Sequence, residues 1–371
     1  MLCLIGIQPA WASQQTLSSQ EEQLQEWITY YYLHNDVSEV GDFLKRIQDS
    51  QVLKNPVGPG LSILGFLSTI FSDNPEQVQA WVKDTNFTGI TKTAVEYALQ
   101  LSGNGKIVTD VFQEAPESVS STPVCLPDSV LKTPEDINVM WGAFYASGRE
   151  LWVKKIIDVL DDEVPLTGDK TRDAQTRAFA EGTLGSNVML HELVNRIIHQ
   201  EINKRSGIVK TKLEEVLAYN EKMITVFPNR DGEFSAMLLI IDPKSAQQEF
   251  AKPFREQMHF EQVSKAMRSD MVTTKIVFSG MELATDLTSD VTYDMKILAP
   301  DGEVYDNADL KELEARKGKT PHRFTVFDNR AGINLRFEPK DKLGKYKIVA
   351  EIKDNIGKKK VPLTGEIELT Q

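Results

Sequence analysis

The segment HELVNRIIHQE, residues 191–201, holds the residue types that come nearest to metal chemistry in this sequence. In the helical zinc sites of metalloproteases two histidines lie four residues apart, so both rings reach one ion, and a glutamate between them activates water. Here Asn195 stands where the second histidine would follow His191 and Glu192. His199 lies two turns from His191, about 12 Å along a helix, which is too far for one ion. The spacing therefore predicts an amphipathic structural helix and no zinc site.

Two glycine-containing segments resemble ligand loops but lack the required spacing. SGNGKIVTD contains a Gly-Lys pair, yet Gln100 and Ile107 occupy the positions where a phosphate-binding loop needs glycine and Ser or Thr. APDGEVYDNAD, residues 299–309, lacks the alternating ligands and terminal glutamate of a calcium loop. We therefore expect a helix end with a turn in the first segment and a strand-joining hairpin in the second.

No nucleophile stands in a recognisable catalytic motif. Cys125 lies in a proline-rich segment without a neighbouring base, and no serine occurs in a G-x-S-x-G sequence. We therefore predict no catalytic, cofactor-binding or metal-binding residues and no enzyme activity. The alternative is an envelope enzyme whose site is assembled from residues distant in sequence.

Aromatic residues are the other side chains that can bind a ligand here. One phrase occurs twice, as Trp-Ile-Thr-Tyr-Tyr at 27–31 and Trp-Gly-Ala-Phe-Tyr at 141–145, each time shortly before a predicted turn between helices. Such rings suit a groove for a sugar or a peptide, although aromatic residues at helical spacing also form cores. The candidate groove residues are Trp27, Tyr30, Tyr31, Trp141, Phe144 and Tyr145.

Length and charge limit the classes of partner. The 371 residues exceed the usual size of one hydrophobic core, which predicts two or three domains. The net charge of -12 argues against nucleic acid and against an anionic membrane surface, because both need basic partners. No segment reaches the roughly 18 to 20 apolar residues that span a bilayer, and no pattern indicates a small-molecule ligand. A protein partner is the class that remains.

The first residues resemble the end of an export signal. A short apolar run precedes Ala10, Trp11 and Ala12, a pattern that suits signal peptidase. We expect residues 1–12 to be the remnant of a signal peptide and the protein to be periplasmic or secreted; a hydrophobic N-terminus of a cytoplasmic protein is the alternative. After cleavage only Cys125 would remain, so no internal disulfide is expected.

The hydrophobic pattern predicts two helical subdomains ahead of a β domain. Apolar residues recur at helical spacing in 13–113 and again in 134–230, and a Pro- and Ser-rich linker, 114–133, lies between them. Thr133 is placed to cap a helix that Gly148 ends. Paired helices of this kind form either hairpin repeats similar to tetratricopeptide arrays or a plain bundle.

In residues 231–371 the period of the hydrophobic pattern changes to two. VTYDMKI, INLRFE, KYKIVAEIK and KVPLTGEIEL alternate apolar with polar residues, as half-buried antiparallel strands do. Apolar runs in FSAMLLIID, TKIVFSG and RFTVF bring the total to about seven or eight strands. We therefore expect a multidomain protein, an all-α region followed by an all-β antiparallel sandwich.

The segment DKLGKYKIV resembles the approach to the sixth strand of immunoglobulin-like domains, through Asp341, Gly344 and Tyr346. This resemblance implies that the tyrosine hydroxyl bonds back to nearby backbone and fixes a corner. The paired cysteines and the core tryptophan of that family are absent, and Tyr293 is the candidate substitute for the tryptophan. As a whole, the chain resembles uncharacterised bacterial exported proteins with a helical region, similar to tetratricopeptide arrays, ahead of an immunoglobulin-like module.

From this organisation we expect a non-catalytic scaffold or interaction protein with a protein partner in the cell envelope. The sandwich would act as a spacer or as a dock, for example by strand addition at an edge. A carbohydrate-binding accessory module and an assembly chaperone for surface structures are the further alternatives.

Overall fold

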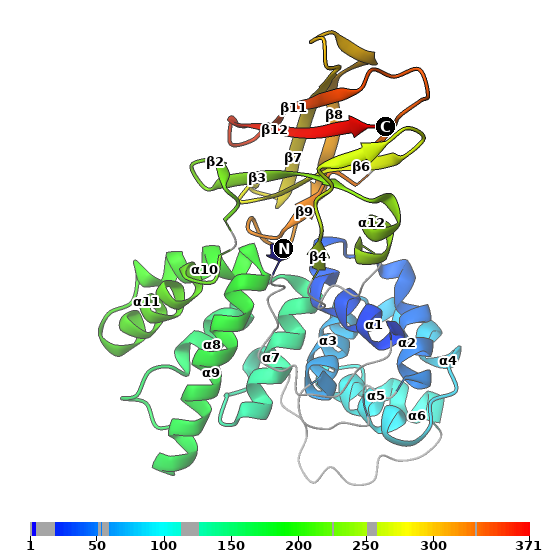
Figure 1. Ribbon diagram of the computed structural model, residues 1–371. Helices are drawn as coiled ribbons and strands as arrows, with labels where there is room; N and C mark the ends of the chain where they lie inside the picture. The colour runs from blue at the N-terminus through cyan, green and yellow to red at the C-terminus, as the bar shows by residue number, and fades with distance from the viewer. Residues whose placement is uncertain are drawn as a thin grey trace. The chain divides into compact units, whose positions relative to one another are not determined.

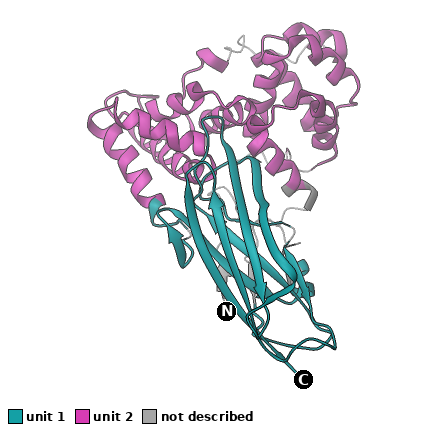
Figure 2. Ribbon diagram, turned by 90° about the horizontal axis from the view of Figure 1, so that it is seen from above, with its two compact units in different colours: residues 1–8, 221–371 teal, residues 9–220 magenta. Residues whose placement is uncertain are grey.

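The computed structural model describes residues 2–4, 19–50, 53, 59–112, 126–224, 226–250, 258–330 and 332–371 (Figure 1). The chain divides into two compact units, a helical unit of residues 9–220 and a β unit of residues 1–8 and 221–371 (Figure 2). Most of the expected signal remnant 1–12, most of the linker 114–133 and Cys125 lie outside the described residues.

Helix α7 (Pro134–Ser147) of the helical unit begins and ends where the sequence predicts. Thr133 and Asp136 form a capping box at the start of α7, and Gly148 ends that helix with φ 64°. None of the described helices is long and apolar enough to cross a membrane. The helices are α1 (Ser19–Tyr30), α2 (Val40–Asp49), α3 (Pro59–Asp73), α4 (Pro75–Lys83), α5 (Gly89–Leu101), α6 (Gly105–Phe112), α7 (Pro134–Ser147), α8 (Glu150–Asp158), α9 (Lys170–Leu190), α10 (Glu192–Ile202) and α11 (Gly207–Glu221).

The backbones of α3 and α7 approach each other closely. A Cβ atom on Gly65 of α3 would lie 1.8 Å from the carbonyl oxygen of Val139, and one on Gly142 of α7 would lie 1.7 Å from that of Ser62. Only glycine at both positions allows the two backbones to touch. Because α3 precedes the expected linker and α7 follows it, the two regions expected as separate helical subdomains share one interior.

The described residues of the β unit form two five-stranded sheets and a short pair. One sheet has the order β10-β6-β3-β2 with β9 also paired to β6, the other has the order β5-β12-β11-β7-β8, and β1 pairs with β4. Neighbours are antiparallel except β5 and β12. The strands are β1 (Leu2–Leu4), β2 (Asn229–Asp231), β3 (Phe234–Ile241), β4 (Met258–Phe260), β5 (Lys265–Met267), β6 (Met271–Ser279), β7 (Thr288–Leu298), β8 (Val304–Lys319), β9 (Phe327–Asp328), β10 (Ile333–Arg336), β11 (Gly344–Asp354) and β12 (Lys359–Thr370).

A hydrophobic core joins the facing sides of the two large sheets. In β7, Val291, Tyr293, Met295 and Ile297 are buried and alternate with half-exposed residues, as the sequence predicts. The same core takes alternate residues of β11 and β12 from one sheet and of β3 and β6 from the other. β3 is buried on both faces, because Met237, Leu239 and Ile241 enter a second cluster. Burial on both sides explains its unbroken apolar run.

Three features of the β unit differ from the expectation. RFTVF is not a strand apart from its last residue, which begins β9 at Phe327. The long edge strand β8 was not expected, because its mostly polar residues hide the period of two, and its pairing with β7 is irregular at three places. A helix, α12 (Pro243–Phe250), lies between β3 and β4.

Candidate functional site

His191, the first residue of the zinc-like segment, lies between two helices. α9 ends at Leu190, α10 begins at Glu192, and the backbone of His191 is extended, with φ -130° and ψ 109°. The His191 side chain is fully buried, whereas His199 is exposed. The expected continuous helix across this segment is therefore wrong at its first residue, and the two histidines face different surroundings.

Aromatic rings surround the His191 side chain. The ring centroids of Tyr30, Phe144 and Tyr145 each lie 5.4 Å from that of His191, and the centroid of Tyr32 lies 5.6 Å away. The Tyr32 hydroxyl lies 3.1 Å from His191 Nδ1, within hydrogen-bond distance. These five residues, which we call the His191 cluster, come from α1, from the turn after it, from α7 and from the α9–α10 junction, so the cluster joins four parts of the helical unit.

Burial keeps Tyr32 and Tyr145 of the His191 cluster protonated. Burial, followed by the nearby Tyr30, Tyr145 and Glu192, raises the pKa of Tyr32 well above its usual value. Burial also raises the pKa of Tyr145, although its hydrogen bond to Asn187 Oδ1 at 2.8 Å acts in the opposite direction. Both hydroxyls are therefore donors near neutral pH. With its ring enclosed, His191 serves packing and hydrogen bonding between helices.

Glu192, the glutamate that would activate water in a zinc protease, is paired with a cation. Its side chain is buried, and Oε1 lies 3.3 Å from Arg196 Nε one turn further along α10. A carboxylate held in this way stabilises the charged guanidinium and is not presented to solvent. Among the described residues, no group of three or more His, Cys, Asp and Glu side chains is arranged to hold a metal ion.

The candidate groove aromatics lie mostly in the core of the helical unit. Tyr31, Trp141, Phe144 and Tyr145 are buried, and Trp27 and Tyr30 are half-buried. The Trp27 ring stacks on Phe43 at 4.4 Å, and its Nε1 donates to Glu39 Oε2 at 2.6 Å. Burial, with Asp36 and further carboxylates, raises the pKa of Tyr31 to about 12. These contacts fill the space between helices, so the six residues do not line an exposed groove.

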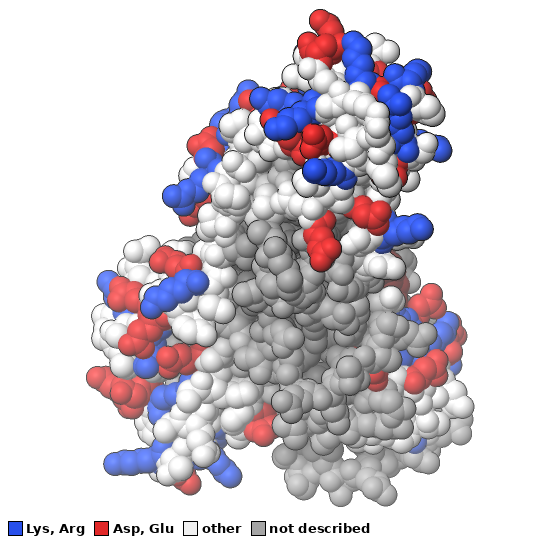
Figure 3. Space-filling model, viewed as in Figure 1, with Lys and Arg blue, Asp and Glu red and all other residues white. Residues whose placement is uncertain are grey.

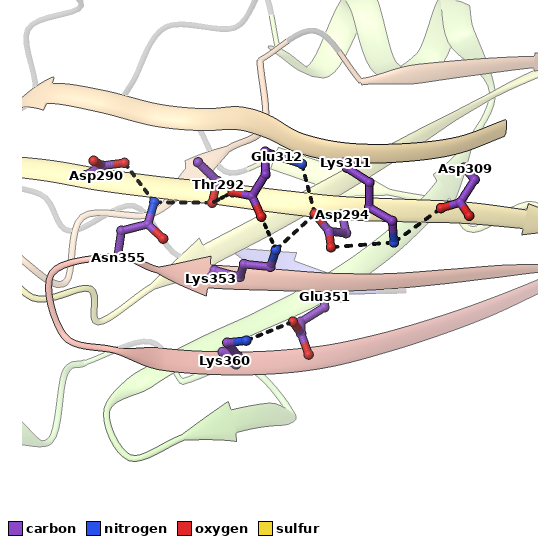
Figure 4. A network of polar contacts seen from close by, with 10 residues as sticks. All are labelled: Asp290, Thr292, Asp294, Asp309, Lys311, Glu312, Glu351, Lys353, Asn355 and Lys360. Atoms are coloured by element: carbon purple, nitrogen blue, oxygen red, sulfur yellow. Dashed lines mark hydrogen bonds and ion pairs between the residues drawn. The ribbon is translucent and has the colours of Figure 1, made fainter.

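Charged side chains cover the outer face of the sheet that contains β7, β8 and β11 (Figure 4). At the centre, Lys353 Nζ lies 3.0 Å from Asp294 Oδ1 and also contacts Glu312. Lys311 Nζ lies 3.6 Å from Asp294 and 3.2 Å from Asp309. We call these five residues the Lys353 ladder. Figure 3 shows Lys and Arg interspersed with Asp and Glu on the visible face of the β unit.

The members of the Lys353 ladder hold one another in the charged state. Partial burial raises the pKa of Asp294, but the Glu312 backbone N–H, 2.9 Å away, and the Lys353 ammonium outweigh it, so the net change lowers that pKa. The hydrogen bonds to Glu312 and Asp294 raise the pKa of Lys353. Groups displaced in these directions do not exchange protons near pH 7, so the ladder is suited to solubility and strand pairing rather than to acid-base catalysis.

The predicted corner residues Asp341, Gly344 and Tyr346 lie together before and at the start of β11. The Tyr346 hydroxyl donates to the carbonyl of Lys342, four residues earlier, at 3.0 Å. Asp341 accepts hydrogen bonds from the Tyr305 hydroxyl and from the Glu338 N–H, each at 2.6 Å. The backbone of Gly344 has φ 129°, a conformation that favours glycine. These bonds hold the loop between β10 and β11 in one conformation.

Three large apolar side chains are exposed beside this loop. Met267 is 57% exposed, Met271 43% and Leu343 40%. Met267 pairs with Thr370 of β12, and a turn closed by the hydrogen bond from Asp270 N–H to the Met267 carbonyl leads to Met271. We call Met267, Met271 and Leu343 the Met267 surface.

The strand register places Leu343 and Met267 on either side of β12. Gly344 pairs with Leu369 of β12, so Leu343 lies beside Thr370 on the side opposite Met267. Sequence reasoning missed this surface, because its members stand singly in segments far apart. The sequence Ser-Asp-Met at 269–271 indicates a turn, but it does not indicate that Leu343 lies across β12 from Met267.

Comparison with known proteins identifies no family. No protein-family model matches the chain, and no curated protein matches it. Among solved structures, a family 123 glycoside hydrolase from Clostridium perfringens shares 13% identity over 37% of this chain, with a TM-score of 0.22. The chain covers 27% of the length of that hydrolase.

Two other solved structures are equally distant. A Niemann-Pick type C2 protein from Japanese carpenter ant shares 9% identity and aligns with 40% of this chain and 95% of its own, at a TM-score of 0.21. An alkylpurine DNA glycosylase from Pseudomonas fluorescens, bound to DNA, shares 10% identity over 95% of this chain and 97% of its own, at a TM-score of 0.23. Scores of this size carry no functional information.

Proposed function

We propose that the protein is a non-catalytic interaction protein of the bacterial cell envelope, periplasmic or secreted, and that it binds a protein partner through the Met267 surface. The main support is the exposure of three large apolar side chains from different segments at one end of the β unit. Single exposed apolar residues are ordinary, but apolar centres inside a polar rim are typical of protein interfaces. The rim here includes the ion pair of Lys265 with Glu368 at 3.7 Å and that of Lys345 with Glu366 at 3.5 Å.

The framework beneath this surface favours binding. The bonds of Tyr346 to the Lys342 carbonyl and of Asp341 to Tyr305 hold the segment that carries Leu343. Arg268, in the turn between Met267 and Met271, donates to the carbonyl of Asp341 at 3.2 Å and links the two segments. A surface ordered before binding loses less conformational entropy when the partner docks.

An immunoglobulin-like sandwich is the fold that we propose for the β unit. Its support is the core shared by two mostly antiparallel sheets and the corner bond of Tyr346. The parallel pairing of β5 with β12 is an addition to that pattern. In such sandwiches the loops at one end often carry the binding residues, which agrees with the position of the Met267 surface.

For the helical unit we propose the role of a scaffold, built from helical hairpins in the manner of tetratricopeptide arrays. The joint of α7 to α8 at Gly148 and the contact between those helices are the support for a hairpin there.

Export is supported by Ala10, Trp11 and Ala12 alone. Fusing the first fifteen residues to a reporter that is active only in the periplasm tests it; an inactive reporter would contradict export from this start.

Site-directed photo-crosslinking tests the protein-binding proposal. A photoreactive amino acid is placed at Leu343 in the full chain, and crosslinks are identified by mass spectrometry in envelope extracts. We expect one reproducible partner, and we expect Met267→Ser to reduce its yield. The matched control places the probe at Val130 of the helical unit, which is 70% exposed. Equal crosslinking patterns from both positions would show that exposure alone, and not the Met267 surface, determines capture.

A further inference from the structure

Two of the three members of the Met267 surface are methionines, and both are open to solvent. Met267 is 57% exposed and Met271 is 43% exposed. Since a dissolved oxidant attacks a methionine sulfur only where it reaches the side chain, exposed methionines oxidise before enclosed ones. Four other methionines in the described part of the chain are buried, each 7% exposed or less: Met140, Met237, Met281 and Met295.

The backbone that carries the two exposed methionines is held by bonds that do not involve their side chains. Met267 N–H donates to Asp270 Oδ2 at 2.7 Å, and Asp270 N–H donates to the Met267 carbonyl at 3.1 Å. Ser269 N–H donates to the Phe337 carbonyl at 2.9 Å, and Phe337 N–H donates to the Asp270 carbonyl at 3.0 Å. A chemical change at the sulfur atoms therefore leaves these bonds in place.

Both methionines face away from the core of the β unit. Their strand neighbours Ala266 and Val272 are 4% and 3% exposed and belong to the core between the sheets. Successive side chains of a strand point to opposite faces, so Met267 and Met271 lie on the outer side. Oxidation of a core methionine such as Met295 would place a polar group among apolar ones, whereas oxidation of these two changes only the surface.

Oxidation of methionine by a peroxide needs no further reactant. The sulfur atom attacks one oxygen of hydrogen peroxide, the O–O bond breaks, an S–O bond forms, and water leaves. The sulfur loses two electrons and the peroxide gains them. The sulfoxide that forms is polar, so an apolar contact residue becomes one that water solvates. In an interface its oxygen would lose hydrogen bonds to water.

We propose that Met267 and Met271 are sites of oxidation by peroxides, and that their conversion to sulfoxides releases the protein partner from the Met267 surface. Two of the three apolar contact residues would become polar at once, and a few central residues carry most of the binding energy of an interface. This inference rests on the proposed function, because a partner must bind before oxidation can release it. The reactivity of the two methionines does not depend on a partner and is tested separately.

Peptide mass spectrometry of the full chain tests the reactivity. Purified protein is exposed to a series of hydrogen peroxide concentrations, the peroxide is removed with catalase, and the protein is digested. We expect Met267 and Met271 to reach half oxidation at about a tenfold lower concentration than Met281 and Met295, because only the first two are exposed. The circular dichroism spectrum should be unchanged at the concentration that oxidises only the exposed pair. Oxidation of Met267 and Met271 as slow as that of the core methionines would overturn the proposal.

Photo-crosslinking from Leu343 tests the release. Purified protein that carries the probe is treated with peroxide at the same concentration, freed of it, and only then added to the envelope extract, so the partner is not oxidised. We expect the crosslink yield to fall about tenfold relative to untreated protein. In the double variant Met267→Leu with Met271→Leu, treatment should leave the yield at its untreated value, whatever that value is. The matched control Met223→Leu removes a methionine that is 46% exposed outside the surface, and it should respond to peroxide as the wild type does.

The outcomes separate the release from the proposed function. No crosslink from untreated wild type would overturn the proposed function and the release with it. A crosslink whose yield peroxide does not change would overturn the release alone. An equal loss in the double variant would also overturn the release, because that variant retains Cys3, Cys125 and the remaining methionines, whose oxidation would then be the cause.

Discussion

The His191 cluster of the helical unit and the Lys353 ladder of the β unit place polar side chains in opposite surroundings. The cluster places a histidine and tyrosine hydroxyls among aromatic rings, away from solvent. The ladder places lysines and carboxylates in pairs on the outer face of a sheet, where Lys311 and Glu312 are 60% and 65% exposed. In the cluster a lost partner leaves a polar group buried, whereas in the ladder water replaces it.

This difference sets the scale of the effects of mutation. When one partner of a buried hydrogen bond is removed, the other partner stays buried without a hydrogen bond, and the protein loses the free energy spent on its desolvation. Exposed ion pairs contribute little to stability, because solvent screens the charges and long side chains lose entropy when they pair. Polar residues in the interior of the helical unit should therefore determine its stability. Those on the sheet face should mainly affect solubility.

The largest effect is expected from Gly142→Ala in the interior of the helical unit. The added Cβ would lie 1.7 Å from the Ser62 carbonyl oxygen, so α3 and α7 must move apart. We expect a loss of about 3 kcal/mol in the free energy of unfolding, as for severe overpacking. Denaturation in urea measures it. Gly182→Ala in α9 is the matched control, since nothing lies within 4 Å of its Cβ position, and it should raise stability by about 0.5 to 1 kcal/mol. Equal effects of the two changes would contradict the close approach.

A smaller effect is expected from Tyr32→Phe in the His191 cluster. The change keeps the ring but removes the hydroxyl that lies 3.1 Å from His191 Nδ1. We expect a loss of about 1 to 3 kcal/mol in the free energy of unfolding, because a buried partner is left behind. Tyr97→Phe is the control, since Tyr97 is 37% exposed and should cost less than about 0.5 kcal/mol. A cost for Tyr32→Phe as small as that of the control would mean that the hydroxyl bond contributes nothing.

The sequence predicts secondary structure well where one face of a helix or strand is buried, because burial of one face produces a regular hydrophobic pattern. The alternation in β7 and β11 and the ends of α7 are confirmed for this reason. β8 was missed, because an edge strand with one solvated side and broken register keeps little alternation. The helix break at His191 was missed as well, since it depends on rings from α1 and α7 that are distant in the sequence.

The candidate sites could be predicted only where neighbours in sequence form them. The corner of Tyr346 uses the carbonyl four residues earlier, and its residues are visible as a motif. The Met267 surface depends on the register between strands, which a single sequence does not give. The aromatic phrase at 27–31 and 141–145 was ambiguous, because rings at helical spacing suit a groove and a core equally.

The smallest effect is expected from the Lys353 ladder, and its dependence on pH distinguishes the ladder from the His191 cluster. A double-mutant cycle with Lys311→Met and Asp294→Asn, an ion pair at 3.6 Å whose lysine is 60% exposed, should give a coupling of about 0.5 to 1 kcal/mol at pH 7. Because the folded protein lowers the pKa of Asp294, this stabilisation is present above the unfolded value of about 3.9 and is lost as pH falls through the lower folded value. Urea denaturation of the four proteins at pH 7 and in acid measures both. A coupling above about 2 kcal/mol, or one that persists in strong acid, would mean that the ladder behaves like a buried pair and that exposure does not explain the difference between the two regions.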